Sequence, residues 1–298
     1  DDLSLTVEPG RIYGFLGPNG AGKSTTMNII TGYLAATGGE VKINGFDVLK
    51  QPEGAKKCVG YLPELPPLYM DMTVKEYLDF VAELKKLDKS LRAGYVKEAM
   101  KITRTEEVSG RLIRNLSKGY RQRVGFAQAV LGYPEILILD EPTVGLDPKQ
   151  IIEIRDLIRE LGKKHTIILS SHILSEISAV CDHVFIISHG KLVASDSTEN
   201  LLERMTGAQE IELLLKAEEN EAETAIREIA QVERCEKTEA KEDGTVGLLV
   251  TAKKDADVRE AIYHTCVEHH MPILEMKAAS KSLEDVFLEL TAQEGGTK

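Results

Sequence analysis

The stretch that decides the fold is Gly17-Pro18-Asn19-Gly20-Ala21-Gly22-Lys23-Ser24-Thr25. Two glycines enclose four residues and are followed by Lys and Ser, which is the pattern of a phosphate-binding loop. Glycine lets the backbone curl so that its N–H groups point inward at phosphate oxygens. Lys23 supplies a mobile positive charge for the outer phosphates, and Ser24 offers a hydroxyl to Mg²⁺. The sequence therefore predicts a site for nucleotide phosphates at residues 17–25.

The residues on either side of this loop support the prediction. Residues 11–16 predict a strand entering the loop, and residues 23–31 predict a helix leaving it. The N-terminus of such a helix adds unsatisfied N–H groups and the positive end of its dipole. A glycine-rich turn without a ligand is the alternative, and the full-length motif between strand and helix argues against it.

Composition excludes several classes of protein. The chain has 298 residues, enough for two domains, and with 42% hydrophobic and 29% charged residues its composition is that of a soluble globular protein. A net charge of -11 argues against broad binding to nucleic acid or anionic membranes, so no nucleic-acid partner is expected. No apolar run approaches the ~20 residues of a membrane span. The four cysteines have neither metal nor redox spacing and indicate reduced cytosolic thiols.

The first two thirds of the chain alternate between strand and helix patterns, which predicts a three-layer α/β domain over residues 1–206. Expected strands are 11–16, 40–44, 58–62, 135–140, 166–170 and a hairpin of 183–188 with 191–195. Expected helices are 73–87, 91–102, 117–131 and 150–161. The run 135–140 is continuously apolar and ends in acid, as in a strand that is buried on both faces of a parallel sheet.

Composition changes near Gly207 and predicts a second, smaller domain over residues 207–298. Strands are expected at 210–216, 233–238, 247–252 and 273–277, with helices at 219–231 and 257–269. This is the βαββαβ order of a ferredoxin-like α+β unit. A last helix is expected at 282–291, followed by a frayed tail at 294–298.

Acidic residues stand where the buried strand ends. Ligands of open parallel sheets bind at the carboxyl ends of the strands. Asp140 is therefore expected to hold Mg²⁺ through water, and Glu141 to orient or deprotonate the water that attacks a γ-phosphate. A surface acidic pair without function is the alternative.

Three further motifs each allow a functional and a purely structural interpretation. Ser117 precedes a predicted helix as its N-cap, and that helix N-terminus is either a second anion site or a plain capped end. The run Gly145-Leu146-Asp147-Pro148 is either functional or a turn into the next helix. His172 follows a buried strand, where it either reaches a γ-phosphate or makes a structural hydrogen bond.

Taken together and in this order, the motifs resemble those of the ATPase subunit of an ABC transporter. Residues 17–25 resemble its Walker A loop, and residues 136–141 its Walker B strand. Residues 116–120 are similar to its signature motif. Residues 145–148 resemble its D-loop, and His172 its switch histidine. The resemblance covers residues 1–206, and residues 282–290 resemble, less specifically, a C-terminal extension of some bacterial exporter ATPases.

The resemblance implies a P-loop NTPase fold with a helical subdomain near residues 70–131 and a small antiparallel β part. It also implies that two copies, or this chain and a homologous ATPase subunit, pack head to tail. ATP then lies between the Walker A loop of one copy and Ser117, Lys118, Gly119 and Tyr120 of the other. The resemblance further implies a D-loop at Gly145, Leu146 and Asp147. It also implies catalytic roles for Lys23, Glu141 and His172.

A separate integral membrane permease would convert closure of this pair into export. The expected location is therefore cytoplasmic, peripheral on the inner face of the cell membrane through the permease. The surface near residues 64–77 is where the resemblance places the contact with that permease. The first strand of the ATPase domain, and the aromatic residue that stacks on adenine, are expected upstream of Asp1.

The sequence departs from the family pattern at three positions. Glu64 stands where the family usually has Gln; a carboxylate still ligates Mg²⁺ but adds negative charge, so altered metal dependence is expected. In the signature, Lys118 replaces the usual Gly and Tyr120 the usual Gln, while Ser117 and Gly119 are retained.

Two other functions remain open at this point. One is a non-transport ABC ATPase that acts on nucleic acid or ribosomes, against which a single ATPase domain and net acidity argue. The other is a nucleotide-dependent switch that does not hydrolyse ATP, against which Glu141 and His172 argue.

Overall fold

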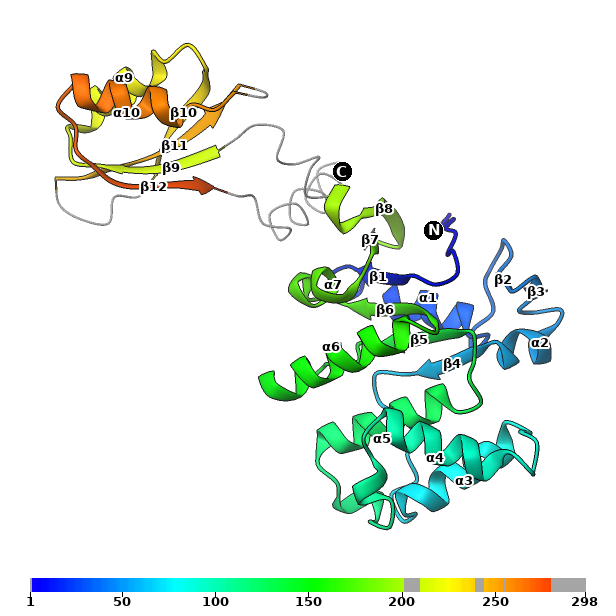
Figure 1. Ribbon diagram of the computed structural model, residues 1–298. Coiled ribbons are helices and arrows are strands. Elements are labelled where there is room, and N and C mark those ends of the chain that lie inside the picture. Colours follow the sequence, from blue (N-terminus) through cyan, green and yellow to red (C-terminus); the bar gives the residue numbers. More distant parts are fainter. Residues whose placement is uncertain (1, 201–209, 239–243, 254–255, 280–298) are drawn as a thin grey trace. The chain divides into compact units, whose positions relative to one another are not determined.

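The computed structural model describes residues 2–200, 210–238, 244–253 and 256–279 (Figure 1). The chain divides into two compact units on either side of Thr198, and each is described by itself. The predicted boundary after residue 206, the predicted helix at 282–291 and the tail at 294–298 all lie outside the described residues, so they stay predictions.

The first unit is built on a six-stranded sheet of order β4-β5-β6-β1-β7-β8. The strands are β4 (Val59–Leu62), β5 (Ile136–Asp140), β6 (Thr166–Ser171), β1 (Ile12–Leu16), β7 (His183–Ser188) and β8 (Lys191–Ser197). Neighbouring strands are parallel except for the hairpin of β7 and β8, which turns at His189 and Gly190, both with positive φ. Five parallel strands thus end at the same edge of the sheet.

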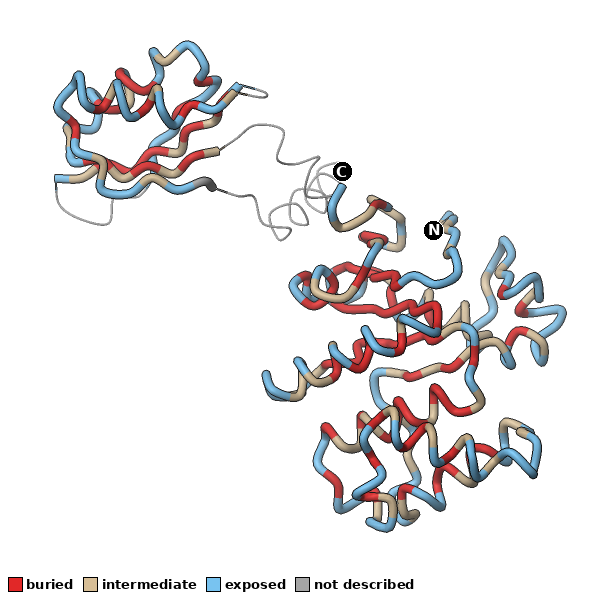
Figure 2. The backbone as a smooth tube through the Cα atoms, viewed as in Figure 1, coloured by how far each residue is buried: buried red, intermediate tan, exposed pale blue. Residues whose placement is uncertain are grey.

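Alternate residues of β1 pack on opposite faces of this sheet. Tyr13 and Phe15 belong to a buried cluster with Met27 of α1 (Lys23–Ile30). On the other face, a Cβ added to Gly14 would lie 2.6 Å from Ile177, which belongs to α7 (Leu174–Val180). The helix α6 (Pro148–Gly162) contacts β6 and α7. The sheet is therefore the middle layer of three, and Figure 2 shows its central strands β5, β6, β1 and β7 largely in the red of buried residues.

A helical part follows β4 in the chain and lies beside this strand, which is an outer strand of the sheet (Figure 1). It contains α3 (Val74–Leu84), α4 (Arg92–Ile102), two short 3₁₀ helices (Glu106–Val108 and Ile113–Asn115) and α5 (Lys118–Val130). Thr73 begins α3 with a capping box: its hydroxyl accepts from the backbone of Glu76, whose carboxylate accepts from the backbone of Thr73. These three helices pack against one another.

A small hairpin of β2 (Lys42–Ile43) and β3 (Phe46–Asp47) turns at Asn44-Gly45, where both residues have positive φ. It precedes α2 (Pro52–Lys57). The predicted three-layer fold, the helical part and the small antiparallel part are confirmed. Two short helices, α2 and α7, were not predicted.

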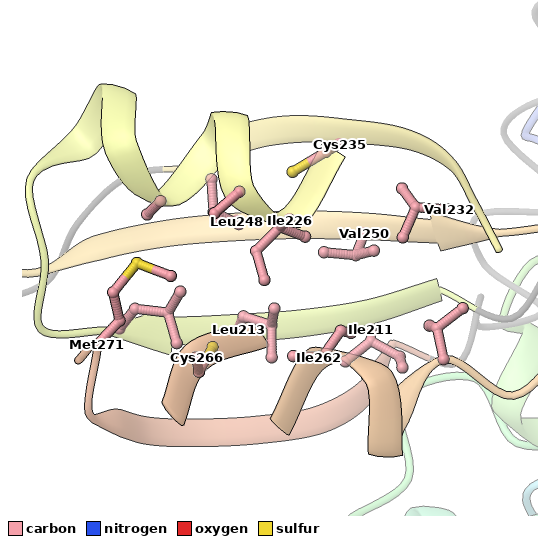
Figure 3. Packing of buried hydrophobic residues seen from close by; sticks show 14 of the residues in the cluster. Ile211, Leu213, Ile226, Val232, Cys235, Leu248, Val250, Ile262, Cys266 and Met271 are labelled. Atoms are coloured by element: carbon pink, nitrogen blue, oxygen red, sulfur yellow. The ribbon is translucent and has the colours of Figure 1, made fainter. Parts of the chain in front are cut away.

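The second unit contains a four-stranded antiparallel sheet of order β10-β11-β9-β12. Its elements are β9 (Glu210–Leu215), α9 (Glu219–Arg227), β10 (Val232–Thr238), β11 (Val246–Ala252), α10 (Arg259–Glu268) and β12 (Ile273–Ala279). Figure 3 shows Ile226 of α9 and Ile262 of α10 packed with Leu213 and Leu248 of the sheet. The predicted βαββαβ order is confirmed in this unit.

Candidate functional site

The candidate site lies at the edge of the sheet where the parallel strands end. The loop of residues 17–22 follows β1, Glu64 follows β4, Asp140 ends β5 and His172 follows β6. A cavity of about 350 Å³ opens there; it is lined by Asn19, Gly20, Gly22, Lys23, Ser24, Thr25, Glu64, Glu141, Val144 and His172. The fold therefore brings together four segments that are far apart in the sequence.

Glycine is required at three positions of the loop. Gly20 has φ 83° and Gly22 has φ 106°, a left-handed region that glycine enters without a steric penalty. A Cβ added to Gly17 would lie 2.4 Å from the carbonyl oxygen of Ile187 in β7. The loop is therefore curled tightly against the sheet and leads directly into α1, whose N-cap is Gly22.

Lys23 crosses back over the loop that precedes it. Its buried ammonium group donates to the carbonyl oxygen of Gly17 at 2.7 Å and to that of Pro18 at 3.3 Å. It also lies 3.5 Å from Oε1 of Glu141, which is buried as well. The positive charge is thus held at the mouth of the loop and partly balances the charge of Glu141.

Asp140 and Ser24 approach each other across the site. The Ser24 hydroxyl donates to Oδ1 of Asp140 at 3.2 Å, and the fully buried Ser170 hydroxyl donates to the same oxygen at 2.6 Å. Ser170 Oγ in turn accepts from the backbone N–H of Glu141 at 3.0 Å. This network fixes the Asp140 carboxylate. It also places the hydroxyl oxygen of Ser24 beside Oδ1 of Asp140.

Glu141 and His172 form a hydrogen-bonded pair, with 3.0 Å between Oε2 and Nδ1. Glu141 has φ 46°, a conformation that non-glycine residues rarely adopt and that functional sites tend to hold under strain. His172 is 39% exposed at its side chain, whereas Glu141 is 8% exposed. The histidine therefore stands between the buried carboxylate and the open side of the cavity.

Tyr61 of β4 lies near Asp140. Burial, and then the negative charge of Asp140, raise the pKa of its hydroxyl to about 12. That hydroxyl donates to the side-chain oxygen of Asn28 in α1 at 3.3 Å. It stays a neutral hydrogen-bond donor throughout the physiological range.

The predicted signature residues do not line this cavity. Ser117 is the exposed N-cap of α5 and accepts from the backbone N–H of Tyr120 at 3.4 Å. Lys118 is exposed, and its ammonium would lie 2.0 Å from a Cβ added to Gly145. Tyr120 donates from its hydroxyl to Glu107, which raises its pKa. The signature therefore lies beside the predicted D-loop of its own chain.

The predicted D-loop has a structural role of its own. Gly145 has φ 69°, and Asp147 begins α6 by accepting from the backbone N–H of Gln150 at 2.9 Å. The preceding loop is also tied to the signature helix, because the buried Gln122 amide donates to the carbonyl oxygen of Pro142 at 2.9 Å. Through this contact α5 is attached to the turn that follows Glu141.

Sequence reasoning missed a buried carboxylate on α7. Oε2 of Glu176 accepts from the Thr143 hydroxyl at 2.5 Å and from the Ser171 hydroxyl at 3.0 Å. The only sequence signal is an acidic residue on the apolar face of a short helix.

Tyr13 is 3% exposed and stacked against Phe185, so it is a core residue rather than a platform on which the adenine base could stack.

The described residues contain neither a metal-binding cluster nor a membrane-spanning helix. Within residues 2–200 and the described parts of the second unit, no group of three or more His, Cys, Asp or Glu is placed to hold a metal ion. In the same residues, no helix combines the length and the apolar character that crossing a bilayer needs. The first observation is compatible with Mg²⁺, which takes only one or two protein carboxylates and completes its shell with water and phosphate oxygens.

Comparison with known proteins identifies the family of the chain. Residues 1–144 match the family described as ABC transporter. The chain is 34% identical to the bacitracin transport ATP-binding protein BcrA of Bacillus licheniformis, over 100% of this chain and 93% of BcrA. It is 29% identical to the linearmycin resistance ATP-binding protein LnrL of Bacillus subtilis, over 98% of this chain and 93% of LnrL.

A solved structure of an ATP-binding subunit of an ABC transporter superposes with a TM-score of 0.62 at 30% identity, over 69% of this chain and 86% of that one. Full-length similarity to such subunits, together with the curled loop and the acids at the strand ends, leads to one conclusion. The chain belongs to the ABC transporter family, as an ATP-binding and ATP-hydrolysing subunit.

Proposed function

We propose that this subunit is a Mg²⁺-dependent ATPase that works as a head-to-tail pair and drives export through a separate membrane subunit. The partner is a second copy of this chain or a homologous ATPase subunit. The C-terminal unit is an accessory domain, and the ATPase domain extends over residues 1–206. In this proposal the protein lies peripherally on the inner face of the cell membrane, held there by the membrane subunit.

The loop of residues 17–25 fits the phosphates of ATP. Its glycines allow backbone N–H groups to line the phosphate path, and the N-terminus of α1 points at the same place. Lys23 already lies at the mouth of the loop, 3.5 Å from Glu141. Phosphate oxygens would compete for the ammonium group and free the Glu141 carboxylate to act on water.

The donor set fits Mg²⁺. Ser24 supplies a hydroxyl and Asp140 a carboxylate, and the two already approach to 3.2 Å. Glu64 lines the same cavity with a second carboxylate. Hydroxyl and carboxylate oxygens are the ligands that this cation prefers, and when bound it neutralises charge on the phosphates. Ser24 and Glu64 would hold it directly and Asp140 through water.

Glu141 and His172 are assigned to the hydrolysis step. Glu141 orients the attacking water and accepts its proton, as a carboxylate within reach of the nucleophile does. His172 is held by Glu141 through Nδ1, which leaves the rest of its ring on the open side of the cavity to meet the γ-phosphate. Lys23 stabilises the negative charge of the phosphates during the transfer.

The observation that carries the paired arrangement is the position of the signature. Ser117 and Lys118 are exposed at the N-terminus of a 13-residue helix with no acidic residue in its first turn, yet they do not line the cavity of their own chain. Such a helix end attracts an anion. The γ-phosphate of a partner's ATP is an anion of this kind, and a two-fold pair places each signature on the other's nucleotide.

The proposed contact with the membrane subunit lies on residues 64–77. Leu65 is 79% exposed, Tyr69 55% and Met70 42%. Exposed apolar side chains that gather in one segment mark interaction surfaces. Export, rather than import, is favoured because the name of LnrL refers to resistance, and resistance to a compound is met by removing it.

Complementation between two inactive variants tests the paired site. In one copy, Lys23→Ala removes the positive charge that binds the phosphates. In the other copy, Ser117→Arg blocks the signature. If each site is shared, mixing the two variants restores roughly a quarter of normal turnover, because half of the dimers are mixed and each has one intact site.

Each variant alone stays inactive in this experiment, and Lys97→Ala, which changes an exposed lysine of α4, keeps normal turnover. A mixture as inactive as its components would contradict the shared site. Co-purification of the chain with a membrane subunit, lost when Leu65 and Tyr69 are changed to Ser, tests the proposed docking surface separately.

A further inference from the structure

We propose that Glu176 is a positioning residue for ATP hydrolysis, because its buried carboxylate ties together the two loops that carry Glu141 and His172. The inference rests on the function proposed above for that pair. It assigns a role to a residue that touches neither the phosphate loop nor the cavity.

The contacts of Glu176 define its place. Its side chain is almost fully buried, with 5% exposure, on the first turns of α7. Oε2 accepts from Thr143 Oγ1 at 2.5 Å and from Ser171 Oγ at 3.0 Å. Thr143 lies two residues after Glu141, and Ser171 directly precedes His172. One carboxylate oxygen thus joins the segment that follows β5 to the last residue of β6.

The conformation of Glu141 explains why this tie matters. Glu141 has φ 46°, and a strained backbone persists only where its surroundings hold it on both sides. On the upstream side, Ser170 binds the Asp140 carboxylate and the Glu141 N–H. On the downstream side, the Thr143 hydroxyl is bound by Glu176.

The helix that carries Glu176 is itself fixed. Ile177, the next residue, packs so closely on β1 that a Cβ added to Gly14 would lie 2.6 Å from it. Ser171 also accepts from the backbone N–H of Ile173, at the start of α7. The carboxylate therefore holds the two loops against a rigid helix, and it sets the distance between Glu141 and His172.

The buried position of Glu176 indicates a specific purpose for its carboxylate. A carboxylate is costly to bury, and an apolar residue at position 176 would pack against α7's neighbours without that cost. Two charge-assisted hydrogen bonds offset the cost and fix geometry. Since misplacement of a catalytic group by about 1 Å can lower a rate about 100-fold, the constraint acts on turnover rather than on ATP binding.

The test uses Thr143→Val, which removes the hydroxyl and keeps the shape, with Thr143→Ser as the control that retains the hydroxyl. Glu176→Leu removes the acceptor in a second variant. We expect kcat to fall between about tenfold and about 100-fold in Thr143→Val and Glu176→Leu, with KM for ATP within about twofold of normal. Thr143→Ser keeps a kcat close to that of the unchanged protein.

The double variant supplies an internal check, since residues that act through one hydrogen bond are not additive. Thr143→Val combined with Glu176→Leu is expected to lower kcat no further than Glu176→Leu alone. Should Glu176→Leu fail to fold, the pair Thr143→Val and Thr143→Ser still decides the matter.

Two results would overturn the inference. One is an unchanged kcat in folded Thr143→Val protein. The other is a loss of kcat that parallels a loss of bound nucleotide per chain, which is the behaviour of a merely structural residue. Glu141→Gln, measured beside them, separates the two proposals: normal turnover in that variant refutes the role of Glu141, whereas an inactive Glu141→Gln with an unaffected Thr143→Val refutes only the role of Glu176.

Discussion

His172 Nδ1 lies 3.0 Å from Oε2 of Glu141, although the two residues follow different strands and are 31 positions apart. The parallel pairing of β5 with β6, in which Asp140 stands opposite Ser170, brings them together. Because a carboxylate only accepts, the proton of this hydrogen bond belongs to the imidazole. The pair joins a buried acid to a more exposed base.

Glu141→Gln is expected to abolish turnover and to preserve ATP binding, because the amide keeps the shape of the side chain and loses its capacity to accept a proton. Phosphate release measures the first effect and titration calorimetry the second. A dimer trapped by ATP should appear in sedimentation. Normal phosphate release from this variant would refute the proposed role of Glu141.

Glu64→Gln is expected to alter metal dependence. Removing one carboxylate charge from the cavity weakens Mg²⁺ binding by about 1 kcal/mol, which raises the half-saturating Mg²⁺ concentration roughly fivefold. Turnover at saturating Mg²⁺ should stay close to normal. The control is Glu233→Gln, which neutralises an exposed carboxylate of the second unit. An unchanged Mg²⁺ titration would remove Glu64 from the site.

Ser170→Ala is expected to destabilise the protein, since it leaves the buried N–H of Glu141 without its acceptor. An unsatisfied buried donor costs about 1–3 kcal/mol in the free energy of unfolding. Urea denaturation measures this. Ser178→Ala, at an exposed position of α7, should change stability by less than about 0.5 kcal/mol. Equal stabilities of the two variants would contradict the proposed network.

Lys85→Met is expected to change how stability depends on pH. Burial lowers the pKa of Lys85 to about 8 from its usual 10.5, while its ammonium donates to the carbonyl oxygens of Gln128 and Leu131 at the end of α5. Between these pH values the unfolded chain binds more protons at this residue than the folded chain. Stability should therefore rise with pH from about 8 to 10.5, by up to about 3 kcal/mol.

The same measurement on Lys85→Met provides the comparison, because methionine fills the space and does not titrate. We expect the rise in the free energy of unfolding between pH 8 and 10 to be lost or greatly reduced in this variant. Identical pH profiles would show that Lys85 keeps a normal proton affinity in the folded state.

The sequence predicted those parts of the fold and the site that local chemistry determines. The glycines of residues 17–22 predict that this loop is curled, and the continuous apolar run of β5 predicts that this strand is buried. The capping box at Thr73 and the turn at Asn44-Gly45, both seen in the structure, likewise depend on neighbouring residues alone. The assigned roles of Lys23, Glu141 and His172 in the reaction remain predictions.

Contacts that depend on tertiary packing were not predictable in this way. Nothing in the sequence near Glu176 indicates that Thr143, 33 positions earlier, donates to it. The short helices α2 and α7 contain too few turns for a helical period to appear. Lys118 and Gly145 also meet only after α5 and the turn before α6 have packed together.

One contact has a consequence for the proposed pair of subunits. The Gln122 amide joins the helix that begins at Ser117 to the carbonyl oxygen of Pro142, the residue after Glu141. In the pair, that helix would meet the neighbour's nucleotide, so a displacement of the helix would be transmitted through one buried hydrogen bond to the general base. The position of Glu141 in each protomer would then depend on whether the ATP bound by the neighbouring subunit is still intact.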